Sequence, residues 1–199
     1  MELKDKLSQC LINSTSEVFS TALSMSPIIM ARSGDVKSED KKEIIAAIGL
    51  AGSLEGSLVV CTTNSSAASV VSKMLGCDVA AGSQDSFDGL GEVTNMLAGG
   101  FKTRISTEGH SFEISIPTVI SGASPLHVCK PHKAEIIQLF VDCSEVNFDL
   151  YLFYTLKSSP SISGAGASKM SNPASKVDPK SSAVPASDNP EDLLKGLIG

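Results

Sequence analysis

An amphipathic pattern over residues 85–108 constrains the fold more than any other part of this 199-residue chain. At about 100° per residue, its large apolar side chains collect on one side of a helix. They are Leu90, Val93, Leu97, Phe101 and Ile105. Such a stripe is typical of a helix that packs against a hydrophobic core. We therefore predict one long helix here, with Asp85 or Ser86 as its N-cap.

The opposite side of this helix carries small and polar residues. They are Asp88, Glu92, Asn95, Gly99 and Lys102. Glu92 and Asn95 are three residues apart, so their side chains are neighbours on the helix surface. Four glycines lie between positions 89 and 100, although each costs about 1 kcal/mol relative to alanine inside a helix. Such repeated breaks of local preference indicate a functional site, and close packing of the glycines against a neighbouring element is the alternative.

The run DGLGEVTNMLAG over residues 88–99, followed by Ile116 and Pro117, resembles the signature of the CheC/CheX/FliY family of CheY phosphatases. That signature is an acidic or hydroxyl residue, three residues, a glutamate, two residues, an asparagine and a proline further along. Gly91 and the glycine-containing segment 49–56 add to the match. CheC and FliY usually carry two such helices, whereas this chain has one, so the resemblance is to CheX.

The resemblance implies a phosphatase that hydrolyses the aspartyl phosphate of a CheY-like response regulator. It implies that Asn95 orients the attacking water and that Glu92 docks on a lysine of the partner. Asp88 and Gly99 would be further partner-binding residues. The Mg²⁺ of the reaction would be carried by the response regulator, so this chain would need no cofactor. The resemblance also implies a homodimer.

A non-catalytic adaptor is the alternative function. It would use the same helix face to bind a receiver domain or a component of the flagellar switch. The presence of the motif does not separate the two hypotheses, because both require the same exposed face.

Outside the long helix, the chain alternates helices with neighbouring strands. The apolar periodicity predicts two further helices, over residues 2–24 and 64–75. Strands are predicted at 44–50, 58–62, 112–117 with a continuation over 118–121, 127–130, 134–143 and 146–156. Neighbouring pairs of strands favour an α+β fold, with an antiparallel or mixed sheet of about six strands that carries three main helices.

From residue 158 the composition changes to Ser, Ala, Pro, Gly and Lys without aromatic residues. Such a segment cannot bury enough apolar surface to offset its loss of conformational entropy. We therefore assign residues 1–157 to one domain and residues 158–199 to a flexible tail. A short apolar motif near the end of the tail either docks on a partner or on the domain, or stays frayed. It contains Leu193, Leu194, Leu197 and Ile198.

Composition narrows the range of partners and compartments. The formal net charge is −6 at pH 7, whereas a nucleic-acid partner would require a basic patch. The longest apolar runs, 44–50 and 136–141, are too short to cross a bilayer. The first ten residues lack the apolar core of a secretory signal, so we expect a cytoplasmic protein. The five cysteines include no C-x-x-C pair, and we expect small buried thiols without a disulfide framework.

Two histidine-containing segments are alternative candidate sites. His127, Cys129 and His132 lie close in the sequence, but Pro131 interrupts the strand geometry and a fourth metal ligand is missing. His110 follows the long helix and has no acid in a recognisable arrangement. We therefore predict no metal site and no nucleophile–histidine pair.

Overall fold

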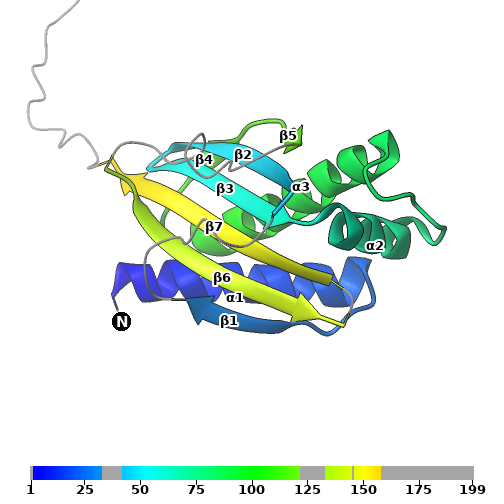
Figure 1. Ribbon diagram of the computed structural model, residues 1–199. Helices are drawn as coiled ribbons and strands as arrows, with labels where there is room; N and C mark the ends of the chain where they lie inside the picture. The colour runs from blue at the N-terminus through cyan, green and yellow to red at the C-terminus, as the bar shows by residue number, and fades with distance from the viewer. Residues whose placement is uncertain (1, 33–41, 122–132, 145, 158–199) are drawn as a thin grey trace, which may run out of the picture. The chain divides into compact units, whose positions relative to one another are not determined.

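The described part of the computed structural model comprises residues 2–32, 42–121, 133–144 and 146–157 (Figure 1). These residues belong to one of the two units into which the chain divides, Met1–Pro160. The predicted strand at 127–130 and the predicted tail lie outside the described residues. The boundary between domain and tail therefore stays a prediction.

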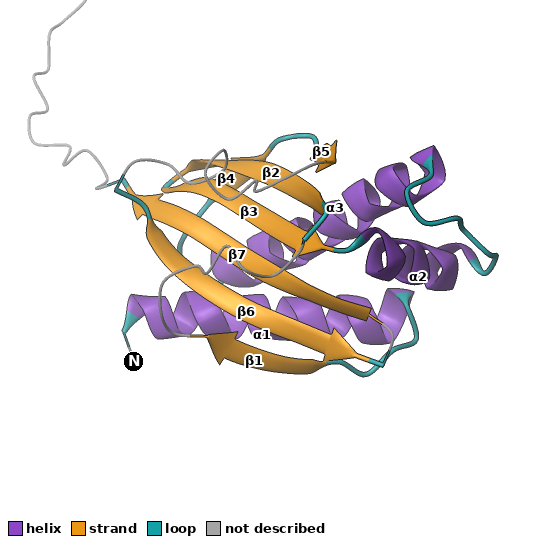
Figure 2. Ribbon diagram, viewed as in Figure 1, coloured by secondary structure: helices purple, strands orange, loops and turns teal. Residues whose placement is uncertain are grey.

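Each predicted helix is present in the described residues, and its ends differ from the prediction by at most two residues. The helices are α1 (Leu3–Ala22), α2 (Asn64–Leu75) and α3 (Gln84–Ser106). The strands are β1 (Ile28–Arg32), β2 (Ile44–Gly52), β3 (Leu54–Thr62), β4 (Phe112–Ile114), β5 (Thr118–Ser121), β6 (Glu135–Cys143) and β7 (Val146–Leu156). Figure 2 shows how the two kinds of element are arranged.

The strands form one antiparallel sheet in the order β1-β6-β7-β3-β2-β4, and β5 also pairs with β2. This confirms the predicted α+β fold, with seven strands in the described residues where about six were expected. Strand β1 is not among the predicted strands, because its residues IIMAR do not alternate in polarity. The strand forms where β6 offers an open edge, and Met30 lies opposite Phe140 there.

All three helices cover the same face of the sheet, the far face in Figure 1. The main core lies between these two layers. Phe19 of α1, Phe101 of α3 and Leu150 of β7 are fully buried in it. The five residues of the predicted apolar stripe are all buried, which confirms the orientation of α3. The other face of the sheet has a smaller apolar cluster of its own, which includes Val59, Tyr151 and Phe153.

The N-terminus of α3 corrects one prediction. Neither Asp85 nor Ser86 caps the helix. The N-cap is Ser83, whose side-chain oxygen accepts a hydrogen bond from the backbone N–H of Ser86 at 3.2 Å. Ser86 is itself fully buried, and its hydroxyl has no hydrogen-bond partner among the described residues. The N-cap of α3 therefore lies two residues before Asp85, the earlier of the two predicted caps.

We expect Ser83→Ala to lower the free energy of unfolding by about 1 kcal/mol, the usual cost of losing a serine cap. Ser86→Ala is the matched control. It removes a buried hydroxyl without a partner, and we expect the free energy of unfolding to stay the same or to rise. Chemical denaturation of both variants measures the difference. Equal losses for the two serines would contradict this assignment of the cap.

One edge of the sheet is irregular where β4 gives way to β5. Leu50 of β2 pairs with Ile114, and Ala47 of β2 pairs with Thr118. Two residues of β2 therefore lie opposite the three residues 115–117. One extra residue on an edge strand defines a β-bulge, which bends the strand and changes the direction of its side chains. This bulge contains the proline of the predicted motif.

Candidate functional site

The candidate site is the solvent-facing side of α3. We call the four residues Asp88, Glu92, Asn95 and Gly99 the motif face. Asp88 and Glu92 are exposed, whereas Asn95 and Gly99 are partly exposed. The predicted outward orientation of these four residues is therefore observed, and Asn95 is not part of the core.

The polar groups of the motif face differ in what they contact. Asp88 accepts a hydrogen bond at 2.8 Å from the side chain of Gln84, one turn earlier in α3. The side chains of Glu92 and Asn95 form no hydrogen bond or ion pair with the described residues. A carboxylate and an amide, about 5–6 Å apart at their Cβ atoms, are thus available to another molecule.

Two of the glycines let α3 approach its neighbouring helices closely. A Cβ at Gly89 would lie 2.3 Å from Cγ1 of Val71 in α2, and a Cβ at Gly100 would lie 2.4 Å from Oγ of Ser14 in α1. The Ser14 hydroxyl also donates a hydrogen bond to the carbonyl oxygen of Leu97 at 3.0 Å. The alternative of helix packing is therefore correct for these two glycines, which fix the position of α3 between α1 and α2.

Gly91 and Gly99 have different surroundings. A Cβ at Gly91 would make ordinary contacts at 3.5 Å with Pro117 and Val119, so this glycine faces the edge of the sheet. A Cβ at Gly99 would have nothing within 4 Å. No contact with the described residues explains the glycine at position 99. The motif face is therefore accessible around Gly99, as a site for a partner requires.

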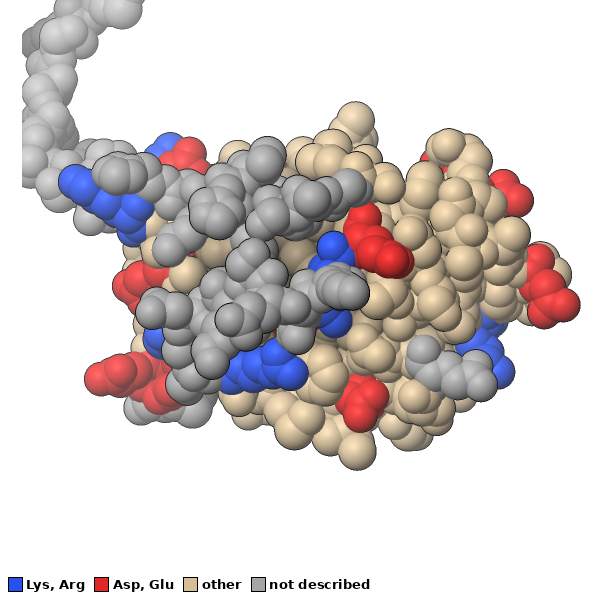
Figure 3. Space-filling model, viewed as in Figure 1, with Lys and Arg blue, Asp and Glu red and all other residues tan. Residues whose placement is uncertain are grey.

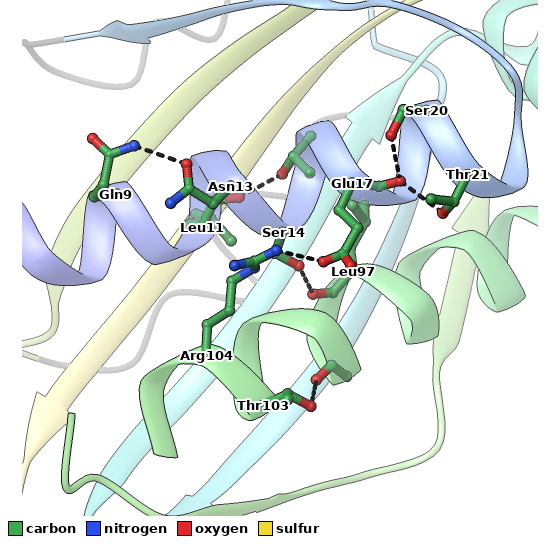
Figure 4. Close-up of polar contacts among 12 residues, drawn as sticks. Gln9, Leu11, Asn13, Ser14, Glu17, Ser20, Thr21, Leu97, Thr103 and Arg104 are labelled. Carbon is green, nitrogen blue, oxygen red and sulfur yellow. Dashed lines mark hydrogen bonds and ion pairs between the residues drawn. The ribbon is translucent and has the colours of Figure 1, made fainter. Parts of the chain in front are cut away.

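A groove of about 730 Å³ lies between α1 and α3, next to the motif face. Figure 4 shows its polar contacts: Glu17 of α1 forms an ion pair with Arg104 of α3, and Asn13 of α1 accepts a hydrogen bond from Gln9 at 2.9 Å. Met96, next to Asn95, also lines the groove. No sequence pattern predicts this contribution of α1, because only the packing of the helices brings α1 and α3 together.

Cys10 also lines this groove and is partly buried. Burial, and after it the nearby Glu108 carboxylate, raise the pKa of the Cys10 thiol. The thiol is therefore protonated at neutral pH, whereas nucleophilic catalysis requires the thiolate. Cys61 and Cys143 are buried, as predicted for cysteines of this chain, but Cys77 is exposed.

Of the other candidate residues, the structure describes only His110. His110 is partly buried in the segment that follows α3, and its side chain forms no hydrogen bond or ion pair with the described residues. His127, Cys129 and His132 lie outside the described residues. On the surface drawn in Figure 3, the described basic side chains alternate with acidic ones and do not form a continuous basic patch. Within the described residues, no helix has the length and apolar character needed to cross a bilayer.

Comparison with known proteins confirms the resemblance that the motif predicted. Residues 44–141 match the family model described as chemotaxis phosphatase CheX. Over 118 residues, the chain is 29% identical to the CheY-P phosphatase CheX of Thermotoga maritima, an alignment that covers 59% of this chain and 76% of that protein.

Solved structures show the same fold. CheX from Desulfovibrio desulfuricans has a TM-score of 0.63 and 28% sequence identity, and the match covers 76% of this chain and 99% of that one. The CheX–CheY–BeF3–Mg²⁺ complex from Borrelia burgdorferi has a TM-score of 0.58 and 20% identity, with 75% of this chain and 97% of that one covered. At 20% identity, the likeness to the Borrelia burgdorferi complex shows the fold alone.

Proposed function

We propose, on the premise that this is a CheX-family domain, that the chain hydrolyses the aspartyl phosphate of a CheY-like response regulator. One observation carries the proposal: Glu92 and Asn95 lie together on the exposed side of α3 and have no partner among the described residues. The relative named as a CheY-P phosphatase supports the reaction, and the relative solved with CheY supports the class of partner.

In this proposal, Asn95 is the catalytic residue. A neutral amide is a poor general base, but it offers both a hydrogen-bond donor and an acceptor. Inserted into the partner's site, it orients a water molecule for in-line attack on phosphorus, as glutamine does in small GTPases. The attack breaks the bond between phosphorus and the aspartyl oxygen, and it releases inorganic phosphate and the free carboxylate. The Mg²⁺ that the reaction requires is held by the response regulator.

Glu92 has a docking role, because a carboxylate and a phosphoryl group repel each other. We propose that it pairs with a lysine beside the phosphorylation site and fixes the orientation of the partner. Charge pairs at interfaces give orientation and specificity as much as affinity. Asp88 lies one turn before Glu92 and contributes to the same acidic surface, while Gly99 lets the backbone of the partner come close.

The direct test is release of inorganic phosphate. The full chain is mixed with a purified CheY-like receiver domain that has been phosphorylated on its aspartate, and phosphate is followed over time. We expect faster release than from the receiver alone. Binding without acceleration would favour the adaptor hypothesis instead, and neither binding nor acceleration would reject both functions for that receiver.

We expect Glu92→Lys to weaken binding to the phosphorylated receiver about tenfold at 0.1 M salt. The variant loses an attraction of about 0.7 kcal/mol and gains a repulsion of similar size, and their sum of about 1.4 kcal/mol corresponds to tenfold. Asp78→Lys, in the exposed connection between α2 and α3, changes the net charge equally and is the control. Isothermal titration calorimetry measures both affinities. An unchanged affinity of Glu92→Lys would remove Glu92 from the interface.

We also propose the homodimer that the resemblance implies. The sheet has outer strands at both edges, β1 and β4, and edge strands offer unpaired backbone groups to a second copy. Light scattering tests this proposal on the 20.7 kDa chain. A mass of one chain at all concentrations would contradict it.

A further inference from the structure

We infer that Ile116 is a docking residue, whose apolar side chain is held outwards beside the motif face to contact the phosphorylated response regulator. The inference rests on the proposed function and adds a contact from outside helix α3. Three observations carry it: the exposure of the side chain, the rigidity of the backbone that holds it, and its position beside Asn95.

Ile116 is 84% exposed, more than any other exposed large apolar side chain among the described residues. Single apolar residues are common on protein surfaces, so exposure alone does not indicate a function. Ile116 differs because it lies in the β-bulge between β4 and β5. Bulges are frequent next to active sites, where they change the direction of a side chain.

Hydrogen bonds to Ser115 fix the backbone of the bulge. The Ser115 N–H donates to the carbonyl oxygen of Gly49 at 2.9 Å, and the Gly49 N–H donates to the Ser115 hydroxyl at 2.9 Å. The same hydroxyl donates to the carbonyl oxygen of Ile116 at 2.8 Å. The residue after Ile116 is Pro117, whose ring restricts the backbone of Ile116. Little conformational entropy of the Ile116 backbone therefore remains to be lost on binding.

Pro117 places Ile116 beside the motif face. Its ring lies 3.5 Å from the position of a Cβ on Gly91. At about 100° per residue, Asn95 points only about 40° away from Gly91 around α3. The ion pair between Lys102 of α3 and Glu113 of β4, at 2.6 Å, holds the same side of the helix against this edge. Ile116 therefore borders the side of the motif face that carries Asn95.

A receiver domain that brings its phosphoaspartate to Asn95 also covers this border, because a stable interface buries about 800 Å² on each partner. The occupant of the Ile116 surface is therefore the surface of the receiver that surrounds its phosphorylation site. Such a contact stabilises the bound ground state and the transition state equally, so its loss weakens binding without slowing the bound complex.

The test uses the full chain and a CheY-like receiver domain. Affinity is measured for the receiver activated with beryllium fluoride and Mg²⁺, and phosphate release is measured at saturating concentrations of this chain. We expect Ile116→Ser to weaken binding roughly tenfold through the loss of buried apolar surface and to leave the maximal rate unchanged. Ile116→Leu should restore the affinity. Ile28→Ser, on β1 at the opposite edge of the sheet and 64% exposed, should behave as wild type.

Three results would overturn the inference alone: an unchanged affinity of Ile116→Ser, a lower maximal rate of that variant, or a loss of self-association in light scattering with receiver binding intact. The last result would assign Ile116 to a contact between copies of this chain. A wild-type chain that neither binds nor dephosphorylates the receiver would overturn the proposed function, and this inference with it. The thermal transition of Ile116→Ser, which should match that of wild type, excludes unfolding as the cause of weaker binding.

Discussion

Asn95→Ala is expected to reduce the acceleration of phosphate release by a factor of about 100 or more, the usual cost of removing one positioned hydrogen-bonding group from a transition state. Its affinity for the phosphorylated receiver should change little. The alanine has neither the donor nor the acceptor that would hold the attacking water. The docking residues remain in place, so the complex still forms.

The structure makes this variant informative. Asn95 is partly exposed, and its side chain makes no hydrogen bond with the described residues, so the substitution leaves the core and the helix contacts intact. Asn13→Ala is the matched control, because Asn13 is an exposed asparagine on the neighbouring helix α1, where it accepts a hydrogen bond from Gln9. The rate of phosphate release and the receiver affinity are measured for both variants. A normal rate with Asn95→Ala would remove this residue from the mechanism.

Gly89→Ala should lower the free energy of unfolding by about 2 kcal/mol. Overpacking of a core costs about 1–3 kcal/mol, and the higher helix propensity of alanine offsets part of this cost. The new methyl group would lie 2.3 Å and 2.7 Å from the two methyl groups of Val71, and 3.1 Å from its Cβ. Valine is β-branched and has one preferred rotamer in a helix. Val71 is also fully buried. Relief therefore requires α2 and α3 to separate.

Gly99→Ala in the same helix is the matched control and should have the opposite sign. Position 99 has open space, so the substitution should raise the free energy of unfolding by up to about 1 kcal/mol through helix propensity. If Gly99 admits the backbone of a partner, the more stable variant should also bind the phosphorylated receiver less tightly. Chemical denaturation and receiver titration measure these effects. A stabilising Gly89→Ala would contradict the tight contact between α2 and α3.

The sequence was most informative for α3. In this helix of 23 residues the apolar stripe runs from Leu90 to Ile105, about four turns, so the period is unambiguous, and the stripe alone indicates which side faces the core. The exposed positions of Asp88 and Glu92 follow from the same geometry. The start of the helix was less well predicted, because Ser83, Asp85 and Ser86 are all good N-cap residues. Only the backbone conformation selects Ser83.

Among the strands, too, the sequence predicted some correctly and did not predict others. Long alternating segments such as β6 and β7 were recognised, whereas the short edge strand β1 was not. The turn between β2 and β3 lies at Ser53, although the predicted strands 44–50 and 58–62 leave a longer connection between them. Residues 51–52 of β2 pair with β4, and residues 54–55 of β3 pair with β7, which extends both strands up to Ser53. Pairing with a neighbour is a tertiary property that local propensity does not contain.

The sequence by itself determined the α+β class, the three helices and a face of α3 that carries Glu92 and Asn95, because periodicity and residue type depend only on neighbouring positions. Tertiary structure alone decided which glycines pack against other helices and which one is open. It also decided that α1 borders the site and that Ile116 projects beside it. These features depend on contacts between residues far apart in the chain, such as Gly100 with Ser14 and Gly91 with Pro117, and no local pattern specifies such contacts.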